Sequence, residues 1–153
     1  MENLEFEILK EQENLELTSF TNEDVFKLGK YLSEKSIKEN LPIVIMIKRN
    51  DDMVFFYANK GTSNDNIWWV ERKLNIVKRF QKSSAYIDAK LKSRSTSFAD
   101  FYGDDKDFAA TGGAFPIRVK NVGVVGAIGI SGLDSNTDHN LAVEGIKFLI
   151  DNK

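Results

Sequence analysis

Two stretches of the sequence each hold two β-type runs joined by a short polar turn, and this arrangement restricts the fold more than any other feature. The four runs are residues 43–47, 53–58, 114–119 and 122–130. The breaks fall at Arg49-Asn50-Asp51-Asp52 and near Lys120-Asn121, and short turns of this kind between β runs are typical of antiparallel hairpins. The first run is continuously apolar, as in a strand that is covered on both faces. The sequence therefore predicts two hairpins.

Helical patterns flank and separate these hairpins. The predicted helices are residues 2–14, 21–40, 67–81, 83–91 and a C-terminal helix that ends at about residue 151. Thr21 and Asp24 form a capping-box pattern for the second helix, and Thr137 or Asp138 is the expected cap of the last one. Residues 15–17 are a candidate short strand. The order helix, hairpin, helix, hairpin, helix predicts an α+β fold, with an antiparallel sheet of four or five strands flanked by helices in a profilin-like or PAS-like layout.

The chain has 153 residues, no cysteine and a single histidine, His139. A chain of this length buries a core without disulfides, so we expect residues 1–153 to form one domain. The absence of cysteine excludes disulfides, thiolate metal sites and cysteine nucleophiles, and a lone histidine excludes multi-histidine metal centres. We therefore expect no metal site, and the remaining residues offer no complete catalytic constellation.

Charge and hydropathy favour a cytoplasmic protein. The 21 basic and 23 acidic residues give a formal net charge of −2, which argues against nucleic acid as a partner. No run approaches the roughly 20 apolar residues of a membrane span. The acidic start, MENLEFEILKEQENLEL, lacks the basic and apolar segments of a secretory signal. We expect a cytoplasmic protein that binds neither nucleic acid nor membrane.

The predicted helix 67–81 has two different faces. The aliphatic residues expected to face the core are Ile67, Val70, Leu74 and Val77. On the opposite side, Trp68, Arg72 and Arg79 fall in line at about 100° per residue. Guanidinium groups bind carboxylates and phosphates through two parallel hydrogen bonds, so this face is a candidate site for an anionic small molecule. Exposed tryptophan and arginine are also typical of protein interfaces, so pairing with acidic groups of another subunit is the alternative.

A second candidate site lies within residues 111–118. Gly112 and Gly113 allow the backbone to come close to a ligand and to direct its N–H groups, and Phe115 and Arg118 follow them. No helix follows these glycines, so the segment is not a P-loop and predicts no nucleotide site. The alternative is structural, a tight entry into an edge strand.

His139 lies near the start of the C-terminal helix. The helix dipole disfavours a charged imidazole there. A neutral ring nitrogen could ligate iron or accept a proton, which makes His139 the candidate catalytic residue. The alternative is a histidine that is hydrogen bonded within the cap region.

Three further patterns indicate close packing. Gly123, Gly126 and Gly129 recur along the last predicted strand, so a packed helix or a ligand is expected to approach it closely. The C-terminal helix is apolar over about half of its circumference, wider than the stripe that covers one sheet, which predicts a second apolar partner such as another subunit. Residues 93–113 are polar and irregular, and so long a loop is either functional or partly helical.

Four segments occur together in a specific combination. They are LPIVIMI, WWVERKLNIVKRFQKSS, TGGAFPIRV, and GVVGAIGISGL followed by Asp138-His139. Together they resemble the uncharacterised protein family 0303, within the haem-degrading (HbpS-like), GlcG-like superfamily. The resemblance implies one GlcG-like domain with a profilin-like sheet, homo-oligomers and, from some members, binding or degradation of haem. The N-terminal histidine of some haem-binding members has no counterpart here, so haem would need another ligand or would bind through its propionates at Arg72 and Arg79.

Three hypotheses follow for the function. The first is a cytoplasmic homo-oligomer without demonstrable catalysis, which binds an anionic small molecule at the Trp68, Arg72 and Arg79 face and the Gly112-Gly113 loop. The second is an enzyme of haem or tetrapyrrole breakdown, with His139 as iron ligand or proton donor. The third is a structural or protein-interaction module whose arginine and tryptophan face joins subunits.

Overall fold

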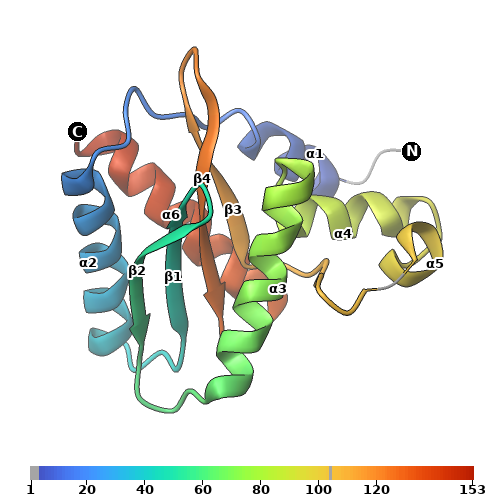
Figure 1. The fold of residues 1–153 in the computed structure, drawn as a ribbon, viewed down its shortest axis with the longest axis horizontal. Helices are drawn as coiled ribbons and strands as arrows, with labels where there is room; N and C mark the ends of the chain where they lie inside the picture. The colour runs from blue at the N-terminus through green and yellow to red at the C-terminus, as the bar shows by residue number, and fades with distance from the viewer. Residues whose placement is uncertain (1–3, 104) are drawn as a thin grey trace.

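The computed structural model describes residues 4–103 and 105–153, which form six helices and four strands (Figure 1). In chain order these are α1 (Leu4–Gln12), α2 (Asn22–Lys38), β1 (Val44–Arg49), β2 (Asp52–Ala58), α3 (Asn64–Phe80), α4 (Ser84–Ser93), α5 (Phe98–Tyr102), β3 (Ala114–Val119), β4 (Gly123–Ser131) and α6 (Ser135–Asp151). The strands form one sheet in the order β2-β1-β4-β3. All neighbouring strands are antiparallel. The predicted α+β fold, an antiparallel sheet flanked by helices, is confirmed.

The two predicted hairpins lie side by side in this sheet. Within them β1 pairs with β2 and β3 pairs with β4, and the sheet is completed by the pairing of β1 with β4. The candidate strand at residues 15–17 is only an isolated bridge, in which Leu17 lies beside Val119. It attaches the N-terminal part of the chain to the β3 edge through a hydrogen bond of 2.7 Å from the Leu17 N–H to the Arg118 carbonyl.

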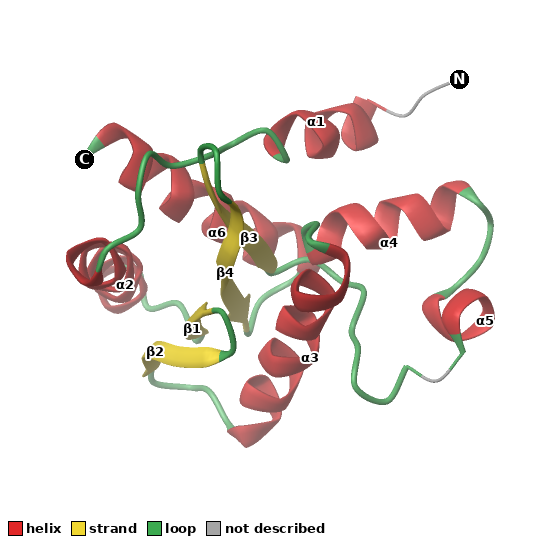
Figure 2. Cartoon of the chain, turned by 45° about the horizontal axis from the view of Figure 1, so that its top comes forward, coloured by secondary structure: helices red, strands yellow, loops and turns green. Residues whose placement is uncertain are grey.

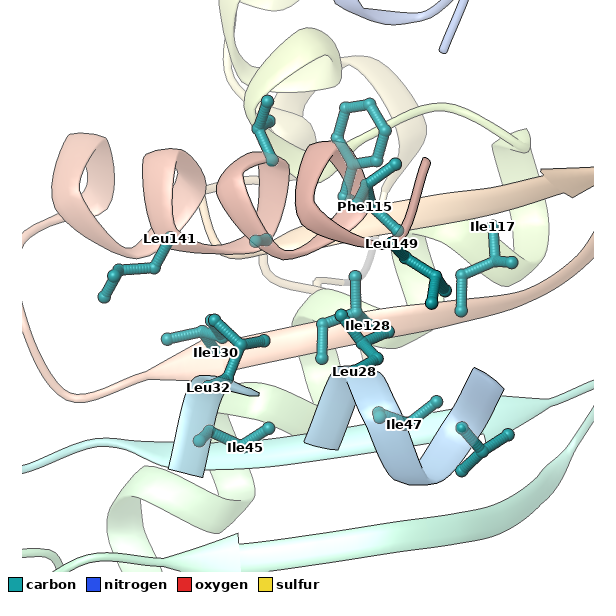
Figure 3. Close-up of a cluster of buried hydrophobic side chains, with 14 of the residues drawn as sticks. Leu28, Leu32, Ile45, Ile47, Phe115, Ile117, Ile128, Ile130, Leu141 and Leu149 are labelled. Carbon is teal, nitrogen blue, oxygen red and sulfur yellow. The ribbon is translucent and has the colours of Figure 1, made fainter. Parts of the chain in front are cut away.

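Helices cover both faces of the sheet (Figure 2). α2 and α6 lie on one face, over a core whose labelled side chains in Figure 3 are Leu28, Leu32, Ile45, Ile47, Phe115, Ile117, Ile128, Ile130, Leu141 and Leu149. α3 lies on the other face, where Val70 and Leu74 pack with Met46. Because β1 is covered on both sides, residues 44–47 are all buried, as their continuous apolar run predicts.

α3 approaches β4 closely at Gly129. A side chain at this position would collide with Val70 and Leu74 of α3. The prediction that a helix or a ligand approaches this strand is confirmed, and the partner at Gly129 is the helix.

The wide apolar surface of α6 is covered within the same chain. Its Gly145 lies against Leu28 and Leu32 of α2, while Ile146 and Leu149 are part of the sheet core. The predicted second apolar partner is therefore α2, which packs beside α6 on the same face of the sheet, rather than another subunit.

The long polar stretch before β3 is partly helical. It contains α5, whose Phe98 packs with Ile76 of α3 and with Ile87 and Leu91 of α4 in a separate buried cluster. The loop between α5 and β3 crosses the outer side of α3, and this crossing shapes the candidate site.

Candidate functional site

α3 carries the predicted arginine face. The helix follows Ser63, whose backbone N–H donates to the Asn66 side chain at 2.9 Å, and Asp65 lies in its first turn, where the helix dipole favours a negative charge. Val70, Leu74 and Val77 on its inner side are buried and Ile67 is partly buried, whereas Trp68 remains 50% exposed and Trp69 remains 37% exposed. The prediction that the helix turns an indole away from the core is confirmed.

Arg72 lies on the outer side and holds a distant part of the chain. Its Nε donates to the carbonyl of Lys106 at 3.1 Å, and its Nη2 donates to the carbonyls of Asp105 and Phe108, each at 2.9 Å. The guanidinium also lies 4.1 Å from the centre of the Trp68 ring. These contacts fix the guanidinium in place without neutralising its charge, because carbonyl groups carry no net charge.

Asn75 completes this attachment one turn further along the helix. Its Nδ2 donates to the Asp107 carbonyl at 2.8 Å, and the Ala109 N–H donates to the Arg72 carbonyl at 3.1 Å. The segment 105–109 is therefore held across the outer side of α3 by hydrogen bonds to its backbone.

Arg79 rests on aromatic rings. Its guanidinium lies 4.9 Å from the ring centre of Phe80, 5.1 Å from that of Tyr102 and 5.2 Å from that of Phe108. Phe108 thus contacts both arginines, through its ring at Arg79 and through its carbonyl at Arg72. The two guanidinium groups lie on the same side of α3, as predicted.

Among the residues that the structure describes, neither Arg72 nor Arg79 is compensated by an acidic side chain. In residues 4–103 and 105–153, Arg118 is the one arginine that forms an ion pair, and no carboxylate lies within 4.0 Å of Arg72 or Arg79. A hollow of about 330 Å³ opens beside Arg72, lined among others by Trp69, Phe98, Phe108, Thr96, Ser97, Thr111, Asp105 and the pair Asp88 and Lys92. Asp88 and Lys92 neutralise each other at 3.0 Å, so Arg72 and Asp105 are the other charged residues of the lining, and Arg79 lies outside it.

The Gly112-Gly113 loop lies elsewhere, at the start of α6. The Gly112 N–H donates to the Ser135 hydroxyl at 2.7 Å, and the Gly113 carbonyl accepts from the Ile130 N–H at 2.8 Å. A side chain at Gly112 would collide with Ser135 and His139. The close approach that the glycines allow is therefore to the protein's own chain.

Phe115 and Arg118 have structural positions. Phe115 is fully buried in the core between the sheet and α6. Arg118 pairs with Glu13 at 2.6 Å and donates to the Gln81 carbonyl at 2.9 Å, while its Nη1 is buried without a hydrogen-bond partner. This buried pair holds the end of α1 against the sheet.

His139 is 5% exposed. Its Nε2 lies 2.7 Å from the Gln12 side-chain oxygen, and its Nδ1 is buried without a hydrogen-bond partner in the described part of the chain. Burial lowers the pKa of His139 to about 4, because an apolar environment disfavours the charged ring. The imidazole is therefore neutral at physiological pH, as predicted.

A cleft of about 770 Å³ lies between α1, α4 and the start of α6, and His139 contributes to its wall. Phe6, Leu9, Ala85 and Ala89 give it an apolar lining. Its charged lining residues are Glu5, Asp88, Asp134 and Lys92, so the lining carries more negative than positive charge.

Sequence reasoning missed a buried ion pair beside the Gly112-Gly113 loop. Lys73 donates to Asp138 and to the Ile130 carbonyl, each at 3.1 Å, with side chains only 5% and 1% exposed. Burial lowers the pKa of Lys73 and raises that of Asp138. The available signal was the position of Lys73, three residues after Val70 on the inner side of the helix. The prediction that Thr137 or Asp138 caps α6 is wrong: the cap is Asp134, because its side chain accepts from the Thr137 N–H.

The structure therefore divides the eight predicted site residues among three places. Trp68, Arg72 and Arg79 form the outer face of α3, which we call the arginine face. Gly112, Gly113, Phe115 and His139 cluster at the start of α6, and Arg118 lies further along β3.

None of the helices in the described residues combines the length and apolar character needed to cross a membrane. The same residues hold no group of three or more acidic, histidine or cysteine side chains placed to bind a metal ion.

Comparison with known proteins identifies the relatives of this chain. The family described as "Haem degrading protein HbpS-like" matches residues 20–147. A UPF0303 protein of Zymomonas mobilis is 39% identical over 140 residues, covering 90% of this chain and 75% of that protein. A UPF0303 protein of Edwardsiella ictaluri is 39% identical over 137 residues, covering 89% and 87%.

Solved structures share the fold. The crystal structure of the Ybr137w protein superposes with a TM-score of 0.88 and 29% identity, over 97% of this chain and 89% of that chain. A crystal structure described as a PduOC:haem complex superposes with a TM-score of 0.68 and 15% identity, over 86% and 94%, which shows a common fold alone. The predicted resemblance is confirmed: the chain belongs to the HbpS-like family and is a relative of its UPF0303 proteins.

Proposed function

We propose that this protein is a single-domain, cytoplasmic, homo-oligomeric ligand-binding protein that binds an anionic small molecule at the arginine face and does not itself catalyse a reaction. One observation carries the proposal: Arg72 and Arg79 lie on one side of α3, are held in place, and have no carboxylate partner within the described residues.

The contacts of the two arginines favour an anion over a neutral ligand. Three carbonyls orient Arg72, and three aromatic rings support Arg79. Both charges are thus placed before a ligand arrives, which reduces the entropy lost on binding. Arg79 can offer its planar fork to carboxylate or phosphate oxygens. Arg72 donates to carbonyls through Nε and Nη2 and offers its Nη1 to an anionic oxygen, so a molecule with two anionic groups fits best.

The surroundings suit a small organic molecule. The hollow beside Arg72 has a volume of about 330 Å³, at the lower end of the range of roughly 300–1,000 Å³ that is typical of ligand sites. Trp69, Phe98 and Phe108 offer apolar surface in it, and Ser97 and Thr111 offer hydroxyl groups. Apolar walls with a few polar groups are the usual composition of such sites.

Haem is one candidate ligand, since the PduOC structure is described as a haem complex. Its two propionates match the two arginines. The cleft beside His139 does not fit it: the lining carries three carboxylates and one lysine, which disfavours a dianionic molecule, and Nδ1 of His139 is enclosed. We therefore derive no haem chemistry from His139.

Intrinsic fluorescence tests the proposal, because Trp68 and Trp69 are the only tryptophans of the chain and both contact Arg72. Titration with malonate, citrate and haem should change the tryptophan emission in a saturable way. Arg72→Ala combined with Arg79→Ala should weaken binding about a hundredfold, corresponding to about 1.4 kcal/mol for each lost charge-assisted contact.

The control for this titration is Arg49→Ala, which removes an arginine bound to Asn22 at 2.8 Å, away from α3. It should leave the affinities unchanged. Affinities that survive the double substitution at Arg72 and Arg79 contradict the proposal. Size-exclusion chromatography with light scattering tests the interface alternative. If the original chain binds no anion and the double variant dissociates into monomers, the arginine face joins subunits.

A further inference from the structure

A second hollow lies on the other side of α3, between the C-terminal half of the helix and the sheet. Its volume is about 430 Å³. Leu74 and Val77 of α3 and Ala127 of β4 form apolar parts of its lining, together with Val124, Val125 and Gly126. The hollow is separate from the arginine face, because Leu74 and Val77 point toward the core whereas Arg72 and Arg79 point outward.

Small residues on β4 leave this space. At Gly129, α3 packs directly on the strand. Further along, Ala127 brings only a methyl group to the α3 side of the sheet, and it lines the hollow together with Gly126. Small residues on this face of β4 therefore have two consequences, a close helix contact at Gly129 and an open space at Ala127.

Lys48 is the uncompensated charge of this hollow. It pairs in register with Ala127, so its side chain lies on the α3 side of the sheet, and it is half-buried. Within the described residues no carboxylate lies within 4.0 Å of its ammonium group. The two other charged lining residues, Lys78 and Asp51, pair with each other at 3.1 Å.

We infer that this hollow binds a small monoanion with an apolar body, such as an aliphatic or aromatic carboxylate. The carboxylate lies at Lys48, because a half-buried ammonium without a partner favours an anion there. The apolar body lies on Leu74, Val77 and Ala127, where burial of apolar surface favours binding. This site goes beyond the proposed function, since it uses none of the residues of the arginine face.

Methyl NMR of the full chain tests this inference, because Leu74, Val77, Val124 and Val125 all line the hollow. Hexanoate and benzoate are added to protein labelled at the leucine and valine methyl groups, with hexanol as the uncharged probe of similar size. Saturable shifts of these four residues are expected for the two carboxylates at millimolar concentration, and hexanol should bind at least about tenfold more weakly, since it lacks the charge.

Three variants test which side chains bind hexanoate and malonate. Lys48→Gln replaces the ammonium group by a neutral polar group on a slightly shorter side chain and should weaken hexanoate binding at least about tenfold, whereas Lys48→Arg should retain it. Arg72→Ala combined with Arg79→Ala should leave hexanoate binding unchanged, and Lys48→Gln should leave malonate binding unchanged. A failure of the proposed function can therefore be distinguished from a failure of this inference. Equal binding of hexanol and hexanoate, unchanged binding in Lys48→Gln, or no shifts at these methyl groups overturns the inference.

Discussion

The arginine face and the start of α6 use charged side chains in opposite ways. At the start of α6, Lys73 and Asp138 neutralise each other inside the protein, and the nearby His139 is kept neutral by burial. On the arginine face, the guanidinium groups are positioned by carbonyls and aromatic rings that leave their charge intact. Under the proposed function, a perturbed, buried ionisable group marks a structural contact, whereas the groups available to a ligand are the charged ones that have no acidic partner among the described residues.

The largest effect is expected at the buried ion pair. Lys73→Met leaves the Asp138 carboxylate buried without its partner and should lower the free energy of unfolding by about 3–5 kcal/mol, measured by urea denaturation. Adding Asp138→Asn should restore much of the loss, since the amide carries no charge. Lys78→Met on the same helix removes an exposed pair with Asp51 and should cost less than about 1 kcal/mol. If Lys73→Met costs no more than Lys78→Met, the two regions do not differ in the way described.

The pH dependence of stability tests the burial of His139. Its pKa falls from 6.5 to about 4 on folding, so between these values the unfolded chain binds more protons than the folded one. The contribution to stability is therefore complete above pH 6.5 and is lost as the pH falls toward 4. Because of this group, the free energy of unfolding should be about 2 kcal/mol lower at pH 5 than at pH 7.

The matched variant for that experiment is His139→Gln, which keeps a donor for Gln12 but does not titrate. Its free energy of unfolding should change less between pH 7 and pH 5 than that of the original chain. Equal slopes would mean that His139 titrates normally in the folded protein.

Arg72→Ala tests whether the segment 105–109 depends on this side chain. The substitution removes three hydrogen bonds to carbonyls and should lower the free energy of unfolding by about 2 kcal/mol. Hydrogen exchange should also become faster at Ala109, whose N–H donates to the Arg72 carbonyl. Unchanged exchange there contradicts the attachment.

The smallest effect on stability is expected for Arg79→Ala. Its contacts to three rings at the surface are worth about 0.5–1 kcal/mol in total, yet the substitution should weaken malonate binding about tenfold. A loss of affinity without a matching loss of stability sharpens the comparison, because it separates a ligand contact from a structural one. An affinity equal to that of the original chain removes Arg79 from the site.

Much of the fold was predictable from local patterns. The runs and turns of residues 43–58 and 114–130 identify both hairpins, and the spacing of Val70, Leu74 and Val77 identifies the buried side of α3. These features depend on residues close together in sequence. The cap of α6 was assigned wrongly, because Asp134, Thr137 and Asp138 are all suitable cap residues and only the structure shows which one points into the core.

The site was only partly predictable, because its contacts join distant residues. Arg118 and Glu13 are separated by 105 positions, and Arg72 reaches carbonyls 33 to 36 positions away. Backbone carbonyls leave no mark in the sequence, so the attachment of the segment 105–109 had no signal. Lys73 did have one, since a lysine among the aliphatic residues of a helix must either extend to solvent or find a buried partner.

A crystal structure of the full assembly grown with malonate tests the central claim most directly. The account predicts malonate carboxylates at about 2.7–2.9 Å from the guanidinium groups of Arg72 and Arg79, with the aromatic contacts of both side chains retained. A structure in which these two arginines are instead buried against acidic side chains of a neighbouring subunit, with no room for an anion, contradicts it.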